Sequence, residues 1–103
     1  MWEIRRASLS DRDALVELCT AAAGPDDYPI AIMDDMILCG VWHVAMSGNR
    51  IVGATHYRDA IDGTGWLAAA RTHREFRQRG VASTLVESFV GLARRTHVPA
   101  LRL

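Results

Sequence analysis

The strongest hydrophobic pattern in the chain follows Gly80. Apolar residues recur there every three or four positions, which is the spacing of one face of an α-helix. They are Val81, Leu85, Phe89 and Leu92. Arg94 and Arg95 close the pattern, where positive charge suits the end of a helix dipole. The spacing predicts an amphipathic helix that opens at Gly80.

Two weaker helical patterns lie nearer the N-terminus. Ser10 is placed as an N-cap with Asp13 three residues later, and the pattern ends at Gly24 and Pro25. Its apolar positions are Leu15, Leu18, Cys19 and Ala22. A second, short helix is predicted within residues 26–40, where apolar residues again share one face. They are Ile30, Met33, Ile37 and Leu38.

Strand patterns fill the segments between these helices. Residues 2–7 predict a short first strand. Residues 41–59 contain two alternating or β-branched apolar runs joined at Gly48 and Asn49, which predicts a β-hairpin.

Two further strands complete the pattern. Residues 60–65 are rich in turn formers, and residues 66–73 are predicted as a strand despite their alanines, because a turn and an arginine-rich loop flank them. Residues 98–103 predict a short apolar last strand. Strands therefore alternate with helices, and residues 1–103 predict a single domain of the α/β class.

Composition narrows the possible functions. Half of the residues are hydrophobic, 23% are charged and the formal net charge is zero, which excludes a disordered chain. A neutral chain without interleaved aromatic and basic residues gives no support to nucleic-acid binding. No apolar run reaches the length of about 18 residues that spans a bilayer, so we expect no membrane contact.

Residue usage also bears on the source and the cell compartment. Cys19 and Cys39 lack CxxC spacing, so neither a disulfide framework nor a zinc site is indicated, and a cytoplasmic location is expected. His43 and His73 have no metal-ligand partners nearby in sequence, so no metal is expected. All 12 basic residues are arginine, which points to a GC-rich, bacterial coding sequence.

The candidate chemistry lies in "REFRQRGVAS", residues 74–83, at the start of the last predicted helix. A helix N-terminus presents unpaired N–H groups and partial positive charge, which attract anions such as phosphate. Gly80 allows close backbone approach, and Arg77 and Arg79 can add charged contacts. Glu75 is expected to pair with these arginines. The alternative interpretation is a solvated loop before an amphipathic helix.

The segment "RQRGVA" resembles the R/Q-x-x-G-x-G/A motif of the GNAT superfamily of N-acetyltransferases, and the element order is similar along nearly the whole chain. The resemblance implies a mixed, mostly antiparallel sheet whose fourth and fifth strands run parallel and splay to admit acetyl-CoA. It also implies that backbone amides of residues 78–83 hold the CoA pyrophosphate, while main-chain groups of Ala70 and Thr72 pair with the pantetheine arm. The implied binding residues are Ala70, Thr72, Arg77, Gln78, Arg79, Gly80, Val81, Ala82 and Ser83.

The chain departs from that family after "ALRL", residues 100–103, its expected fifth strand. The helix and the last two strands that follow in the family, with their usual catalytic tyrosine, are not present in the sequence. No carboxylate occurs in residues 66–73, so no general base is assigned. We expect a C-terminally incomplete fold whose open sheet edge pairs with a second copy, as a homodimer, or with the rest of a longer chain.

Other motifs carry less weight. "GTGWLA", residues 63–68, matches a dinucleotide-binding fingerprint but follows a hairpin turn, so it is interpreted as a turn. His56 and Tyr57 point to opposite faces of a strand, so at most one of them can face a cleft, and both are interpreted as packing or surface residues rather than catalytic ones. Tyr28 lies in a region that lines the acceptor pocket in the family that the chain resembles.

These observations favour an enzyme that transfers an acetyl group from acetyl-CoA to an amine. Two alternatives stay open. One is a non-catalytic acyl-CoA-binding or regulatory module, and the other is an assembly domain that pairs through its open sheet edge.

Overall fold

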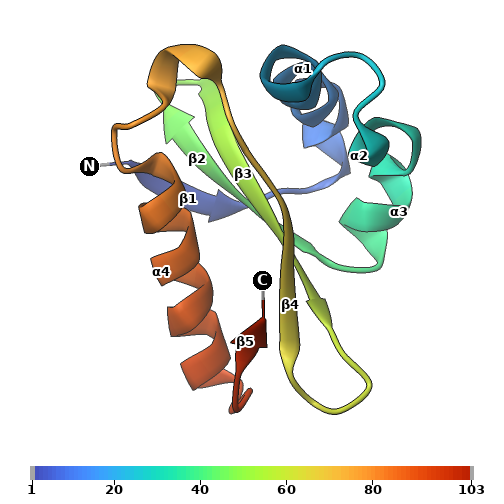
Figure 1. Cartoon of the computed structure of the whole chain (residues 1–103), viewed down its shortest axis with the longest axis vertical. Helices are drawn as coiled ribbons and strands as arrows, with labels where there is room; N and C mark the ends of the chain where they lie inside the picture. The colour runs from blue at the N-terminus through green and yellow to red at the C-terminus, as the bar shows by residue number, and fades with distance from the viewer. Residues whose placement is uncertain (1, 103) are drawn as a thin grey trace.

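A five-stranded mixed sheet forms the centre of the computed structural model, which describes residues 2–102 (Figure 1). The strands lie in chain order and are β1 (Glu3–Arg6), β2 (Val41–Ser47), β3 (Arg50–Asp59), β4 (Gly65–Thr72) and β5 (Leu101–Arg102). The first four pair in antiparallel fashion, and β5 runs parallel to β4. The expected mixed, mostly antiparallel sheet is confirmed; Leu103, the end of the predicted last strand, lies outside the described residues.

Helices cover both faces of the sheet. One face carries α4 (Val81–Arg95), and the other carries α1 (Arg12–Ala23), α2 (Tyr28–Ala31) and α3 (Met33–Leu38) (Figure 1). No helix within residues 2–102 has both the length and the apolar composition that a bilayer crossing needs.

Alternation along β2 shows how the strands serve both helical layers. Trp42 and Val44 are buried in the cluster under α1 and α3, whereas Ala45 joins Val81 and Leu85 beneath α4. Successive side chains of a strand point to opposite faces, so an apolar run such as β2 or β3 supplies two cores at once. The hairpin predicted at Gly48 and Asn49 is confirmed.

The first helix begins later than predicted. Ser10 is not its N-cap, because Leu9–Asp11 forms a 3-10 turn and α1 begins at Arg12. The Asp11 carboxylate accepts the backbone N–H of Ser8 at 2.9 Å and two guanidinium hydrogen bonds from Arg5 at 2.8 and 2.9 Å. This pairing of Ser8 with Asp11 takes the place of the predicted pairing of Ser10 with Asp13.

The second predicted helix is divided in two. Ile32 leaves helical geometry, with φ −121° and ψ 23°, and separates α2 from α3. Apolar periodicity did not reveal this break, because buried residues occur on both sides of it; Pro29 and Met33 are examples. The break leaves Tyr28 and Ile32 exposed beside the sheet.

The contact between β4 and β5 is short. Gly65 pairs with Leu101 and Trp66 with Arg102, and the remainder of β4, residues 67–72, pairs with β3 alone within the part of the chain described here. The carboxyl end of β4 is followed by the loop that leads into α4. An unpaired length of strand therefore leads directly toward a helix N-terminus.

Candidate functional site

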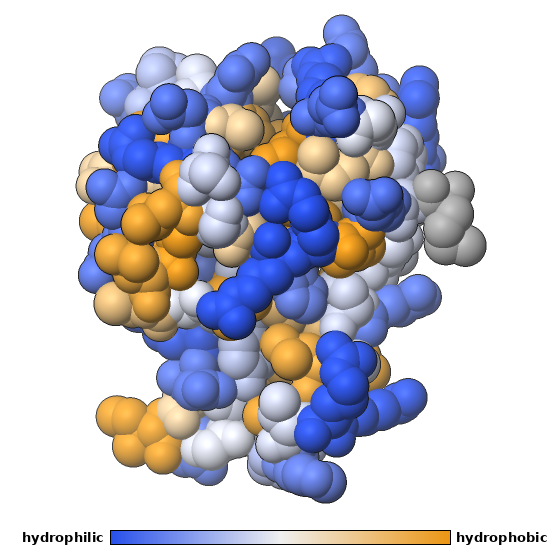
Figure 2. Space-filling view, turned by 180° about the vertical axis from the view of Figure 1, so that it is seen from behind, coloured by the Kyte–Doolittle hydropathy of each residue, from blue (hydrophilic) through white to orange (hydrophobic). Residues whose placement is uncertain are grey.

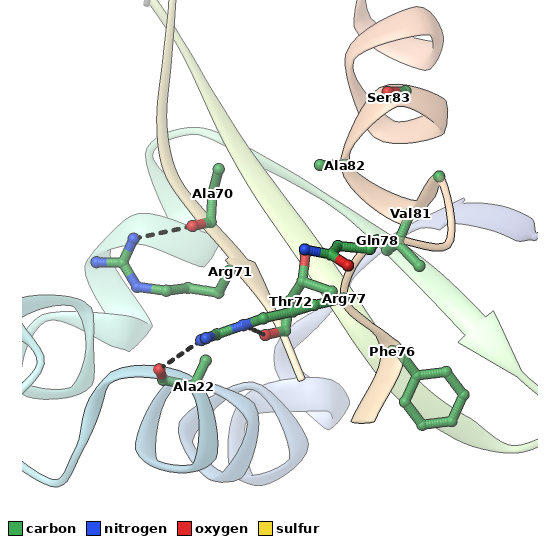
Figure 3. A pocket seen from close by; sticks show the side chains of 11 residues that line it. Ala22, Ala70, Arg71, Thr72, Phe76, Arg77, Gln78, Val81, Ala82 and Ser83 are labelled. Atoms are coloured by element: carbon green, nitrogen blue, oxygen red, sulfur yellow. Dashed lines mark hydrogen bonds between the residues drawn. The ribbon is translucent and has the colours of Figure 1, made fainter. Parts of the chain in front are cut away.

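A cavity of about 400 Å³ lies where the end of β4, the start of α4 and the end of α1 meet (Figure 3). Every binding residue implied by the sequence except Arg79 lines it. The lining consists of Ala22, Ala70, Arg71, Thr72, Phe76, Arg77, Gln78, Gly80, Val81, Ala82 and Ser83. Sequence reasoning missed Ala22, Arg71 and Phe76, because only the fold brings the end of α1 and the strand side chain to this place.

The loop that forms one wall has an unusual backbone. Gln78 and Gly80 have φ values of +61° and +80°, in the left-handed region. A Cβ atom at Gly80 would meet no atom within 4 Å, so the glycine is required by its φ angle rather than by crowding within the chain. The turn ends at Gly80, and α4 begins at the next residue.

The first turn of α4 is fixed against the sheet. Val81 is buried, and a Cβ atom placed on Gly53 of β3 would lie 2.4 Å from Val81 Cγ1. Gly53 therefore allows the helix to approach the sheet closely. The exposed Ala82 and Ser83 line the cavity, and no acidic residue occurs in the first turn. The N-terminal partial positive charge of α4 is not offset locally.

The side chain of Arg77 forms part of the cavity wall and bonds to two other elements. Its guanidinium donates to the carbonyl of Ala22 at 3.0 Å and to that of Thr72 at 3.4 Å, as the dashed lines in Figure 3 show. Ala22 lies in the last turn of α1, where carbonyl groups lack helical partners. Arg77 thus joins the end of α1 to the end of β4.

Arg79 and Glu75 depart from the sequence expectations. The guanidinium of Arg79 lies 5.4 Å from the ring centre of Phe76 and does not line the cavity, while its carbonyl accepts a hydrogen bond from Trp2 at 3.0 Å. The expected pairing of Glu75 with the loop arginines is wrong, since its carboxylate lies 3.9 Å from Arg50 of β3. Arg50 comes near through the β2–β3 hairpin, which local sequence does not reveal.

A β-bulge interrupts β4 beside the cavity. Ala54 pairs with Arg71 and His56 with Ala68, so two residues of β4 face one residue of β3. Ala69 has φ +53° at this point. Because the backbone turns here, the free edge of β4 changes direction between Ala68 and Arg71.

An ion pair anchors the loop before α2 to this bulged strand. Arg71 donates to Asp27 at 2.7 and 2.8 Å, and also to the carbonyl of Ala70 at 3.0 Å. The guanidinium holds the pKa of the Asp27 carboxyl below its usual range. Burial, aided by the Asp27 charge, raises the pKa of the neighbouring Cys19 thiol to about 11. Both side chains therefore keep fixed protonation states near neutral pH.

A smaller cavity of about 160 Å³ lies further along β4, on the side of α2 and α3. Tyr28 and Trp66 are 54% and 43% exposed at its rim, so large aromatic surfaces face solvent there. Its lining consists of Tyr28, Ile32, Met36, His56, Arg58, Trp66 and Ala68. The two cavities reach Ala68 and Ala70 of the same strand, which lie on either side of the bulge residue Ala69.

The remaining candidates are His56, Tyr57 and residues 63–68. His56 is 3% exposed and donates from Nε2 to the carbonyl of Met36 at 2.7 Å, while Tyr57 is buried against Phe89 on the opposite face. Both side chains are buried in the fold, and His56 also contributes to the lining of the smaller cavity. Residues 63–68 form a turn followed by β4, with no helix start, as expected. No group of potential metal ligands occurs among residues 2–102.

Several solved structures share the fold of this chain. Ribosomal-protein-alanine N-acetyltransferase from Brucella melitensis biovar Abortus 2308 matches with a TM-score of 0.82 and 20% identity over 100% of this chain and 78% of that protein. A transcriptional regulator from Bacillus halodurans C-125 matches with a TM-score of 0.80 and 19% identity, over 100% and 81%. The aminoglycoside N-acetyltransferase AAC(6')-Iy, solved in complex with CoA, matches with a TM-score of 0.78 and 18% identity, over 99% and 75%. At these identities the likeness establishes the fold.

The sequence comparisons give two further results. No curated protein matches the chain. The family model described as Acetyltransferase (GNAT) family matches residues 11–103, which include both cavities and the whole sheet after β1. The chain therefore belongs to the GNAT acetyltransferase family.

Proposed function

We propose that the chain binds acetyl-CoA in the cavity between β4 and α4 and transfers its acetyl group to an amine. One observation carries the proposal: the unpaired edge of β4 and the N-terminus of α4 open into the same cavity. A strand edge suits an extended arm with amide groups, and a helix N-terminus suits a pyrophosphate.

The pyrophosphate end of the ligand is assigned to the first turn of α4. The N–H groups of Val81, Ala82 and Ser83 have no acceptor four residues earlier in the helix. The left-handed turn at Gln78 and Gly80 directs the preceding backbone around the same point. Successive amides in such turns form a concave anion site. No carboxylate lines this cavity, which supports binding of a dianion.

The pantetheine arm is assigned to the free edge of β4. The carbonyls of Ala70 and Thr72 already accept hydrogen bonds from Arg71 and Arg77. A carbonyl oxygen has two lone pairs, so an added strand can share these acceptors or replace the arginine contacts. The 3.4 Å contact from Arg77 to Thr72 is the longer of its two, and on this proposal Arg77 exchanges it for a phosphate oxygen.

The acceptor is assigned to the smaller cavity beside Tyr28 and Trp66. That cavity and the donor cavity meet β4 on either side of Ala69, so an amine and a thioester bound in them approach each other at the bulge. In the transfer the amine nitrogen forms a bond to the acetyl carbon, the carbon–sulfur bond breaks, and the proton released by the amine balances the one taken by the thiolate.

The lining of the acceptor cavity bears on the class of amine. Aromatic and apolar side chains dominate it, Arg58 brings a positive charge, and no carboxylate lines it. Polycationic amines would meet Arg58 without an opposing charge. We therefore propose an acceptor whose amine is attached to an apolar or aromatic group.

The test combines binding with turnover. Ala82→Glu adds a carboxylate at the exposed first turn of α4, which suits the helix dipole but repels a pyrophosphate. Calorimetric titration should show that this variant binds acetyl-CoA at least about tenfold more weakly than the parent chain, a loss of about 1.4 kcal/mol. Val86→Glu is the control, because Val86 is exposed on the same helix and lines neither cavity.

Thiol release from acetyl-CoA then separates the possible outcomes. Turnover with apolar or aromatic amines and little turnover with an aminoglycoside is the expected result. Binding without turnover of any amine would identify a non-catalytic acyl-CoA-binding module instead. Equal affinities for the Ala82→Glu and Val86→Glu variants would remove the assignment of the pyrophosphate to α4.

A further inference from the structure

A polar groove lies between β1, β2 and the C-terminal half of α4. Its volume is about 380 Å³, and it shares no lining residue with either cavity described above. The lining consists of Ile4, Arg5, Arg6, His43, Glu87, Ser88, Gly91 and Arg95. Figure 2, which views the molecule from behind, shows strongly hydrophilic side chains over β1 and over the lower part of α4.

The sheet contributes two basic side chains that face each other. Arg6 of β1 and His43 of β2 are paired directly across the antiparallel ladder, so their side chains share the face that α4 covers. The His43 ring stacks on Phe89 with 4.0 Å between ring centres and 9° between ring planes. This stacking fixes the imidazole within the groove wall.

Hydrogen bonds define which atom of His43 is available. Ser88 donates its hydroxyl proton to the carbonyl of Leu85 at 2.6 Å, so its oxygen accepts from Nδ1–H of His43 at 2.8 Å. Nε2 of His43 has no hydrogen-bond partner among residues 2–102. Protonation at Nε2 would give the groove a further cationic donor.

The helix contributes a guanidinium that folds back over a glycine. Nη1 of Arg95 lies 3.3 Å from the place where a Cβ atom on Gly91 would stand. Gly91 and Ser88 precede Arg95 by four and seven residues, so the three lie on one helical face. Because Gly91 has no side chain, the guanidinium of Arg95 can lie along that face, above the groove.

The arginines of this groove differ in whether a carboxylate of residues 2–102 pairs with them. Within residues 2–102 no carboxylate lies within 4.0 Å of the guanidinium of Arg6 or Arg95, although Glu87 belongs to the lining. Arg5 is different, because Asp11 binds it at 2.8 Å. Burial, together with the charges of Arg6 and Arg95, holds the pKa of His43 below its ordinary value. The positive charges of Arg6, Arg95 and a protonated His43 repel one another, and a bound anion would reduce that repulsion.

We propose that this groove binds a phosphate group, either as the free ion or on a small phosphate monoester, through Arg6, Arg95 and His43. Arginine pairs with phosphate oxygens in a two-pronged geometry, and histidine adds one donor when protonated. Ser83 and Arg95 are 12 positions apart in α4, which corresponds to about 18 Å along the helix. The groove is therefore separate from the proposed acetyl-CoA cavity, and the inference does not depend on it.

The test follows the His43 ring signals by nuclear magnetic resonance while inorganic phosphate is added at constant ionic strength and pH. Arg6→Gln and Arg95→Gln each remove one proposed contact. Arg94→Gln is the charge-matched control, because Arg94 is the exposed neighbour that does not line the groove. We expect saturable shifts in the parent chain and in the Arg94→Gln variant, an upward shift of the His43 pKa on saturation, and affinity at least about tenfold lower in the other two variants.

Three results would overturn the inference. Equal responses in the three variants would show that Arg6 and Arg95 do not hold the phosphate, and unchanged His43 signals in the parent chain would show that phosphate does not bind in this groove. An unsaturated, linear response would indicate weak adventitious contact. Repeating the titration with a phosphate monoester distinguishes the free ion from the esterified group, since the tighter ligand is the better match to the groove.

Discussion

At the scale of single residues, the paired Asp27 and Arg71 link the loop before α2 to the bulged strand β4. Their side chains are 7% and 19% exposed, and two hydrogen bonds of 2.7 and 2.8 Å join them. The Arg71 guanidinium also lies 5.8 Å from the ring centre of Tyr28, at the rim of the smaller cavity. The pair therefore fixes the position of that rim relative to β4.

Asp27→Asn should lower the free energy of unfolding at pH 7 by about 2 kcal/mol, because a nearly buried charged hydrogen bond is lost. The pKa of Asp27 is lower in the folded chain, so its contribution is present above the unfolded pKa of about 3.9 and is lost as the pH falls through the folded value. Urea unfolding at pH 7 and in acid measures both effects.

Asp34→Asn is the matched control for this pair. Asp34 binds Arg12 at 2.6 Å, but the two side chains are 61% and 46% exposed, and exposed ion pairs contribute little to stability, so a smaller loss than for Asp27→Asn is expected. If the free energies of unfolding of Asp27→Asn and the parent differed by the same amount at pH 7 and in acid, the charge of Asp27 would not be what stabilises the fold.

At the scale of elements, two glycines contact or belong to α4, and substitutions of the two are expected to change stability in opposite directions. Gly53 of β3 lies beneath the first turn of the helix, whereas Gly91 lies within the helix. A Cβ atom at Gly53 would stand 2.4 Å from Val81 Cγ1 and 3.4 Å from Leu85 Cδ1. At Gly91 the nearest atom is the end of the flexible Arg95 side chain.

Gly53→Ala should therefore destabilise the fold by about 1–3 kcal/mol, as overpacking does, and displace the N-terminus of α4. Gly91→Ala should instead stabilise it by up to about 1 kcal/mol, since alanine is the better helix former. Thermal unfolding of the two variants gives the sign of each effect. If Gly53→Ala unfolded at the parent temperature, α4 would not be held to the sheet at this point.

The helices and strands also show which features of the fold the sequence predicted and which it did not. Apolar periodicity and turn chemistry predicted the hairpin and α4, because these features depend on residues close together in the chain. The break at Ile32 and the bulge at Ala69 escaped prediction, because buried residues lie on both sides of the break and an alanine run carries no local signal for a bulge. The same reason explains why Arg71 and Ala22 were missed at the cavity and why Glu75 was assigned the wrong partner.

At the scale of the whole molecule, two cavities lie along one strand, which we propose hold the acetyl donor and the amine acceptor, and a separate basic groove lies between α4, β1 and β2. The hydrophobic tip of the β3–β4 hairpin projects beyond this body, at the lower left of Figure 2, where Ile61 is fully exposed. Pairing through an open sheet edge, as a homodimer or with another segment, stays a prediction that light scattering can test.

On the proposed binding mode, acetyl-CoA lies along the free edge of β4 and ends at the first turn of α4. Backbone amide shifts measured while CoA is added to the labelled chain test it most directly. We expect saturable shifts concentrated at residues 68–72 and 78–83, with the His43 and Arg95 amides unchanged. Saturable shifts that cluster elsewhere, or none in a folded sample, would contradict it.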